Sequence, residues 1–174
     1  NRWSGMRARV LVRPRSLCNA PQKLNSLSKL FPRRFVNADH LRALFTKPYG
    51  QDAPTEAQWR ELYDENVHFK DPTQEREGIK AYIEAQDGLM RRCDDVYLQP
   101  ASIAIEGNTA FVEWEMGLKI KGIEFIYPGT SRLLFNDDGK VCDHRDYFDF
   151  VGPTFEPVPV VGGFVRWVYK RFVD

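Results

Sequence analysis

The chain has 174 residues, of which 43% are hydrophobic and 28% charged, and its formal net charge at pH 7 is +1. This length is enough for one domain with a real core, and no apolar run approaches the ~18 residues of a membrane-spanning helix. The charge is uneven: residues 1–37 hold nine Arg or Lys and no acid, while the rest hold 16 basic and 24 acidic residues. The excess of acidic residues after residue 37 argues against nucleic-acid binding by the folded domain.

Residues 1–36 form a basic N-terminal extension. They are rich in Arg and Ser, contain three prolines and lack acids, which is the composition of an organelle transit peptide. A basic arm for a nucleic acid or an anionic membrane, a flexible tail, and translated sequence upstream of a start at Met6 are the alternatives. We take residues 37–151 as the folded domain and residues 152–174 as a proline-rich connector followed by a helix.

The sequence predicts no metal and no cofactor. The three cysteines have no metal-site spacing, and their odd number favours free thiols in a reducing compartment, cytoplasmic or organellar. A ligand motif such as His-Glu-x-x-His and a glycine-rich phosphate loop are both missing from the sequence. A metal held by Asp71, His144 and Asp146 is the alternative.

Two helices are expected before the first strand. Asn37 or Asp39 can cap a helix whose apolar residues recur at i, i+3 and i+4. After a loop with Pro48, Thr55 and Gln58 have the spacing of a capping box at the start of the second helix. The apolar stripe of that helix consists of Trp59, Leu62 and Tyr63.

Residues 67–71 alternate and stop at Pro72, which predicts a strand with Val67, Phe69 and Asp71 on its inward face. The alternative for Asp71 is that it merely opens the Asp-Pro turn. A third helix begins at residues 78–79, and its apolar stripe is typical of a core helix.

From residue 93 the pattern changes to period two. Long strands are expected at residues 96–106, with a break near Pro100, and at 110–120, 124–135 and 141–150, joined by short turns. In the second of these, Trp114 and Met116 should be buried, and Glu113 and Glu115 exposed. Because no strand–helix–strand alternation occurs, the fold class is α+β, with helices on one face of a bent antiparallel sheet.

The last strand carries the strongest chemical signal. Its alternation places His144, Asp146 and Phe148 on one face and Tyr147 on the other. Neither face is cleanly apolar, so ionisable groups are expected at least partly inside. An edge strand with solvated charges is the alternative.

Three segments in this order, residues 62–72 (LYDENVHFKDP), 77–82 (EGIKAY) and 133–149 (LLFNDDGKVCDHRDYFD), resemble the SnoaL-like branch of the nuclear transport factor two-like superfamily. That superfamily also holds ketosteroid isomerases, scytalone dehydratase, limonene epoxide hydrolase and polyketide cyclases. The resemblance covers residues 38–151. It implies a cone-shaped curved antiparallel sheet that wraps around N-terminal helices and encloses an apolar cavity.

The resemblance also implies a site. It puts Asp71 at the general-base position of ketosteroid isomerase and Ser131 at the position of its oxyanion-hole acid, and it points His144 and Asp146 into the cavity. No Tyr matches the phenolic oxyanion donor. Our hypothesis is that Asp71 or Asp146 removes a proton next to a carbonyl or activates a water, while His144 returns a proton or stabilises the oxyanion. The expected substrate contacts are Trp114, Met116, Ser131, Leu133, Tyr147 and Phe148.

Three classes of function follow from these residues. The first is a cofactor-independent isomerase, cyclase, dehydratase or hydrolase acting on a hydrophobic small molecule. A non-catalytic binder of such a molecule and a protein-interaction module are the alternatives, since a fold does not fix a function.

The C-terminal part is expected to have two pieces. Residues 150–159 are too rich in proline for a helix or a central strand. Residues 160–172 should form a helix with Phe164 and Trp167 on one side and mainly basic residues on the other. We expect this helix to pack on its own domain, for example over the cavity mouth; a homodimer contact and an interfacial membrane helix are the alternatives.

Overall fold

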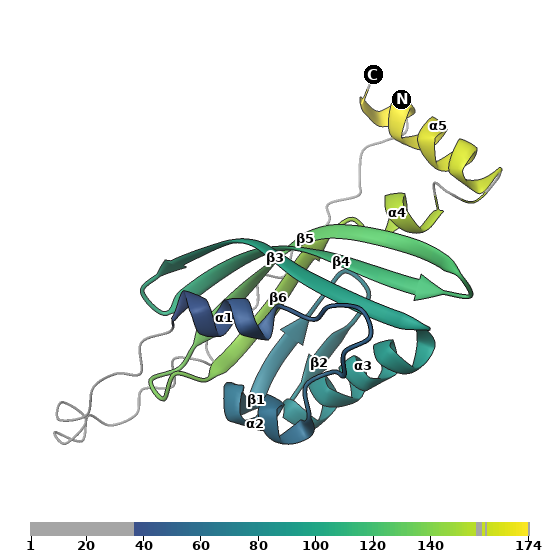
Figure 1. Cartoon of the computed structure of the whole chain (residues 1–174). Helices are drawn as coiled ribbons and strands as arrows, with labels where there is room; N and C mark the ends of the chain where they lie inside the picture. The colour runs from purple at the N-terminus through teal and green to yellow at the C-terminus, as the bar shows by residue number, and fades with distance from the viewer. Residues whose placement is uncertain (1–36, 156–157, 159, 174) are drawn as a thin grey trace, which may run out of the picture.

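The fold is a curved, unclosed six-stranded sheet with the first three helices on its inner side (Figure 1). This computed structural model describes residues 37–155, 158 and 160–173, so the predictions for residues 1–36 lie outside the described residues. The elements are α1 (Ala38–Leu44), α2 (Glu56–Leu62), β1 (Tyr63–Lys70), β2 (Glu75–Glu77), α3 (Ile79–Arg92), β3 (Asp95–Glu106), β4 (Thr109–Ile120), β5 (Ile123–Phe135), β6 (Val141–Phe148), α4 (Val151–Phe155) and α5 (Val161–Val173).

The strand order is β2-β1-β6-β5-β4-β3. Strands β3 to β6 form the antiparallel meander that the sequence predicted, and the α+β class is confirmed. The expected break near Pro100 is a shift of register between Pro100 and Ser102. One pairing was not predicted: β1 lies parallel to β6 and brings the N-terminal half of the domain against the strand that carries His144.

The first two helices begin at the capping residues that the sequence predicted. The Asn37 side chain accepts a hydrogen bond from the Asp39 backbone N–H, and Thr55 with Gln58 forms a complete capping box. Tyr63 is a correction: it was assigned to the helix stripe, but its backbone is extended (φ −109°, ψ 146°) and it begins β1. Its ring therefore lies inside the cone, where it is 1% exposed.

Residues 151–155 also differ from the prediction, because they form the short helix α4. The Asp149 carboxylate accepts hydrogen bonds from the backbone N–H groups of Val151 and Gly152 and so caps this helix. Pro153 lies in the first turn, where a backbone N–H has no intrahelical partner to lose. The proline is thus compatible with a helix of this length. The predicted C-terminal helix is confirmed as α5.

The core lies between the inner face of the sheet and helices α2 and α3, and it contains side chains such as Phe69, Tyr82 and Val112. In β4 the predicted alternation is confirmed: Trp114 is buried, Met116 is half-buried, and the glutamates between them are exposed. None of the described helices is long and apolar enough to cross a membrane.

The thiols divide. Cys93 is free, whereas Cys142 is disulfide-bonded. The expectation of free thiols is therefore wrong for Cys142, and the reducing compartment inferred from it loses that support. Cys18 lies outside the described residues.

Candidate functional site

A cavity of about 450 Å³ opens on the inner face of the sheet and is bounded by β4, β5, β6 and the helices. Asp71, His144 and Asp146 all line it. Four of the six expected substrate contacts line it as well: Trp114, Met116, Ser131 and Phe148. The volume lies in the range of small-molecule sites.

The antiparallel register of β5 and β6 builds the polar part of this cavity. Ser131 lies directly opposite Asp146, and Leu133 lies opposite His144. Gly129 on β5 faces Trp114 across the β4–β5 pair, and a Cβ at residue 129 would lie 2.4 Å from the indole ring. The ring can therefore lie over the strand and reach Ser131 only because position 129 has no side chain.

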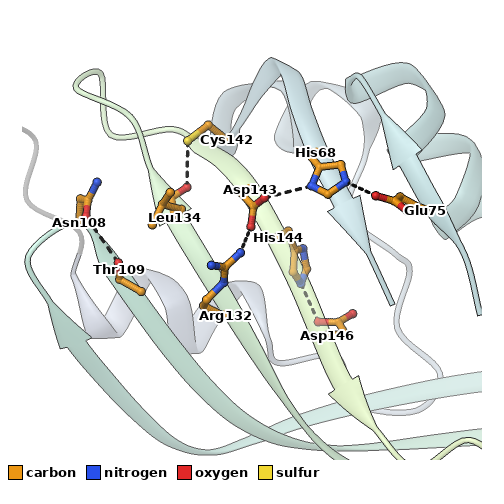
Figure 2. A network of polar contacts seen from close by, with 10 residues as sticks. All are labelled: His68, Glu75, Asn108, Thr109, Arg132, Leu134, Cys142, Asp143, His144 and Asp146. Atoms are coloured by element: carbon orange, nitrogen blue, oxygen red, sulfur yellow. Dashed lines mark hydrogen bonds and ion pairs between the residues drawn. The ribbon is translucent and has the colours of Figure 1, made fainter. Parts of the chain in front are cut away.

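His144 is buried, and both of its ring nitrogens are engaged. Nε2 lies 2.8 Å from Asp146 Oδ1 (Figure 2), and Nδ1 lies 3.0 Å from the Tyr63 hydroxyl. The Tyr82 hydroxyl donates to Tyr63 at 3.1 Å. If Tyr63 in turn donates to Nδ1, a neutral His144 carries its proton on Nε2 and donates it to Asp146.

Burial raises the pKa of the Tyr63 phenol, and likewise that of the Tyr82 phenol. Both hydroxyls therefore stay protonated at physiological pH and remain hydrogen-bond donors. Together with His144 they form a continuous chain of hydrogen bonds that ends on the Asp146 carboxylate.

Asp146 Oδ1 receives a second hydrogen bond. Ser131 Oγ donates to it at 2.5 Å and accepts from the Trp114 indole N–H at 2.8 Å. Within the described part of the chain, no hydrogen bond reaches Asp146 Oδ2. One oxygen of this half-buried carboxylate is thus fixed by two donors, and the other is available to a ligand.

Asp71 has a different environment, although it lines the same cavity. Its Oδ1 accepts from the backbone N–H groups of Thr73 and Gln74 and from the Thr73 hydroxyl, and its Oδ2 accepts from the Gln74 amide. These bonds close the turn after β1, which was the alternative assigned to Asp71 from the sequence. Among the described residues Asp71 makes no hydrogen bond to the His144–Asp146 pair.

Two expected substrate contacts lie elsewhere. Tyr147 is 47% exposed on the outer face of β6, where the Arg145 guanidinium lies 5.0 Å from its ring centre. Leu133 is fully buried in the core and is not part of the cavity wall.

The outer face of β6 carries an ionic network of its own, drawn in Figure 2. His68 Nδ1 lies 3.0 Å from Asp143 Oδ2, and its Nε2 lies 2.8 Å from Glu75 Oε1. Arg132 pairs with the other oxygen of Asp143. Burial alone would lower the pKa of His68, but the hydrogen bonds and charges of Asp143 and Glu75 outweigh it and raise that pKa.

A larger cavity, of about 760 Å³, lies beside the first and is lined mainly by α1, α2 and the turn before β6. It does not include His144 or Asp146. We place the site in the smaller cavity because that one contains the buried His144 imidazole in a hydrogen bond with the Asp146 carboxylate.

Sequence reasoning missed Tyr63 and Tyr82. Tyr63 was assigned to the apolar stripe of the second helix, and Tyr82 lies on the apolar stripe of the third. The Tyr63 hydroxyl is hydrogen-bonded to His144 and the Tyr82 hydroxyl to that of Tyr63, and both residues line the cavity. The hydroxyl itself was the available signal, since a buried Tyr needs a partner for its O–H. The sequence gives no indication that this partner would be on β6, because the parallel β1–β6 pairing was not expected.

Together, the fold and this cavity define an α+β cone with a polar pair at its inner wall. The chain matches the SnoaL-like domain family over residues 41–144, which is more than half of its length. The protein therefore belongs to the SnoaL-like domain family. No curated protein sequence matched it.

Solved structures agree on the fold. A hypothetical protein with a ketosteroid isomerase-like fold from Catenulispora acidiphila, in complex with trimethylamine, has a TM-score of 0.52 and 16% identity and covers 56% of this chain and 77% of its own. An NTF2-like protein of unknown function from Burkholderia pseudomallei has a TM-score of 0.50 and 14% identity, with coverages of 54% and 78%. At these identities the likeness shows the fold alone.

Proposed function

We propose that this protein is a cofactor-independent acid/base enzyme that acts on a hydrophobic small molecule in the cone cavity. The observation that carries the proposal is the pair of the buried His144 and the half-buried Asp146, whose carboxylate has one oxygen held by two donors and the other available. A positioned carboxylate in a largely apolar cavity is suited to take a proton from carbon or from water.

In this proposal Asp146 is the base. His144 and Ser131 position its carboxylate through Oδ1, so Oδ2 meets the substrate. The Tyr63–Tyr82 pair keeps its protons, and its chain of hydrogen bonds to Nδ1 holds the His144 ring in place. Asp71 remains a second candidate for the base, but its four bonds within the turn favour a role in shaping the rim.

The cavity wall indicates the substrate class. Apart from the polar groups above, it is lined largely by apolar and aromatic side chains, including Trp114, Tyr127 and Phe148. Trp114 and Tyr127 each lie 5.9 Å from the Phe148 ring, measured between centroids. An apolar molecule with a carbonyl or an epoxide matches this wall, because its one polar group can be directed to Asp146.

A non-catalytic binder of the same kind of molecule is the second candidate. It is favoured by one observation: both ring nitrogens of His144 are already bonded within the protein. In that case the pair would serve to satisfy buried polar groups and shape the cavity rather than to transfer protons.

The test is exchange of carbon-bound hydrogen. The full chain is incubated in D₂O with a panel of apolar ketones, and deuterium at the α-carbon is measured by mass spectrometry; hydrolysis of apolar epoxides is followed in parallel. The proposal expects turnover of at least one of the two classes by the wild type. It also expects a rate lower by about 10²–10⁴-fold in Asp146→Asn. Tyr147→Phe, on the outer face of the same strand, is the matched control and should be unchanged.

Two results would contradict catalysis at this pair. If Asp146→Asn turns over as fast as the wild type, the base lies elsewhere. If ligands bind the wild type tightly but neither exchange nor hydrolysis exceeds the rate without protein, the non-catalytic binder is correct.

A further inference from the structure

The C-terminal helix α5 presents an aromatic face that nothing in the described part of the chain covers. Phe164, Trp167 and Phe172 are 63%, 60% and 86% exposed, and the rings of Phe164 and Trp167 stack with centroids 5.9 Å apart. The helix packs against α4, and Figure 1 shows it apart from α1, α2 and α3. Large rings left in water on one side of a helix indicate a surface that meets another apolar phase.

The charge of this helix contrasts with that of the domain. Within residues 161–173 there are three basic residues and no acid, whereas residues 38–160 hold 13 basic and 23 acidic residues. Lys170 and Arg171 lie in the last turns of α5 and are exposed. An anionic surface would therefore attract α5 and repel the rest of the domain.

We propose that α5 binds the surface of an anionic membrane, lying in the headgroup region with Phe164 and Trp167 toward the acyl chains. A helix of 13 residues is about 20 Å long and cannot span a bilayer, but it suits an interfacial position. Aromatic rings at the boundary and cations toward the lipid phosphates are the two features of such helices.

A second copy of the chain fits α5 less well. Two such helices packed face to face in parallel would bring Lys170 and Arg171 of each copy together without any acidic residue of α5 to pair with them. The contact of α5 with α4 of the same chain leaves the aromatic face uncovered by the described residues, so packing onto the domain, which the sequence favoured, does not account for that face.

Helix α5 follows the part of the chain that forms one wall of the cavity. The preceding helix α4 contributes Thr154 to the cavity wall, where the threonine hydroxyl lies 2.9 Å from the Tyr127 hydroxyl. Phe150, just before α4, also lines the cavity and stacks on Tyr127 at 6.4 Å. A membrane-bound α5 would thus hold one wall of the cavity near the lipid surface, whatever reaction takes place inside.

The test is binding of the full chain to lipid vesicles by flotation, with vesicles of phosphatidylcholine alone and of phosphatidylcholine with phosphatidylglycerol. Binding should require the anionic lipid and weaken as salt is raised. The double variant Lys170→Gln/Arg171→Gln should bind the anionic vesicles about 30-fold more weakly, since each basic side chain near such a surface contributes about a fivefold factor. Trp167→Ser should weaken binding roughly tenfold or more through lost apolar contact.

Two control variants test whether the loss of binding is specific to α5. Phe111→Ser removes a ring that is exposed on β4, and Lys80→Gln/Lys121→Gln removes two charges elsewhere on the surface; both should bind like the wild type. Sedimentation velocity without lipid gives the oligomeric state. The proposal is overturned if the wild type fails to bind, if the α5 variants bind as well as the wild type, or if the chain is a dimer that Trp167→Ser separates into monomers.

Discussion

Ser131 is the residue at which the polar site can be tested through stability. Its side chain is 1% exposed, accepts from the Trp114 indole and donates to Asp146. Substituting Ser131→Ala leaves the buried indole N–H without its acceptor, which costs about 1–3 kcal/mol, and removes a hydrogen bond to a carboxylate, worth about 1.5–3 kcal/mol. Because the two effects share one atom and the site can relax, we expect a loss of about 3 kcal/mol in the free energy of unfolding.

Equilibrium unfolding in urea measures this loss from the shift of the midpoint at unchanged slope. Ser102→Ala is the control: that hydroxyl also donates to a carboxylate, that of Glu113, but on the exposed outer face. It should change the free energy of unfolding by no more than about 0.5 kcal/mol. If Ser131→Ala costs no more than Ser102→Ala, the buried network does not contribute as described.

Three further outcomes are expected. Gly129→Ala should cost about 1–3 kcal/mol by forcing its Cβ against Trp114, whereas Gly163→Ala in open space on α5 should not destabilise; equal melting temperatures for the two variants would contradict this. Because the pKa of His68 is raised in the folded state, its stabilisation is complete below about pH 6.5 and is lost as pH rises through the raised value. The excess unfolding free energy of the wild type over His68→Gln should therefore be larger at about pH 5.5 than at about pH 8.5, and a difference independent of pH would argue against the network. Tyr63→Phe removes the partner of both the His144 ring and the Tyr82 hydroxyl and should lower the unfolding free energy by about 1–3 kcal/mol in urea titrations; no change would mean that this hydroxyl chain is not formed.

Local patterns predicted much of the fold. The caps at Asn37 and Thr55, the meander from β3 to β6 and the placement of His144 and Asp146 on one face of their strand all depend on interactions between residues close in sequence or on strict alternation. That this face points into the cavity was implied by the family resemblance and not by the alternation. Such features are visible in a single sequence because their physical cause is local.

The errors arose where distant segments meet. The pairing of β1 with β6 joins residues about 75 positions apart, and only this pairing brings the Tyr63 hydroxyl to His144. Helix α4 was missed because prolines are a strong signal against helices, whereas in a first turn they are tolerated. Tyr147 was taken as a site residue although its own strand alternation places it on the outer face.

The most direct test of the account is whether a ligand meets the His144–Asp146 pair. In the free protein, nuclear magnetic resonance should show a protected His144 Nε2–H signal, because this proton is buried in a bond to the carboxylate. An apolar ketone that the protein binds should shift that signal and the Trp114 indole N–H signal together, and Asp146→Asn should remove the protection. A ligand that saturates the protein while both signals stay in place would contradict the assignment of the cavity as the functional site.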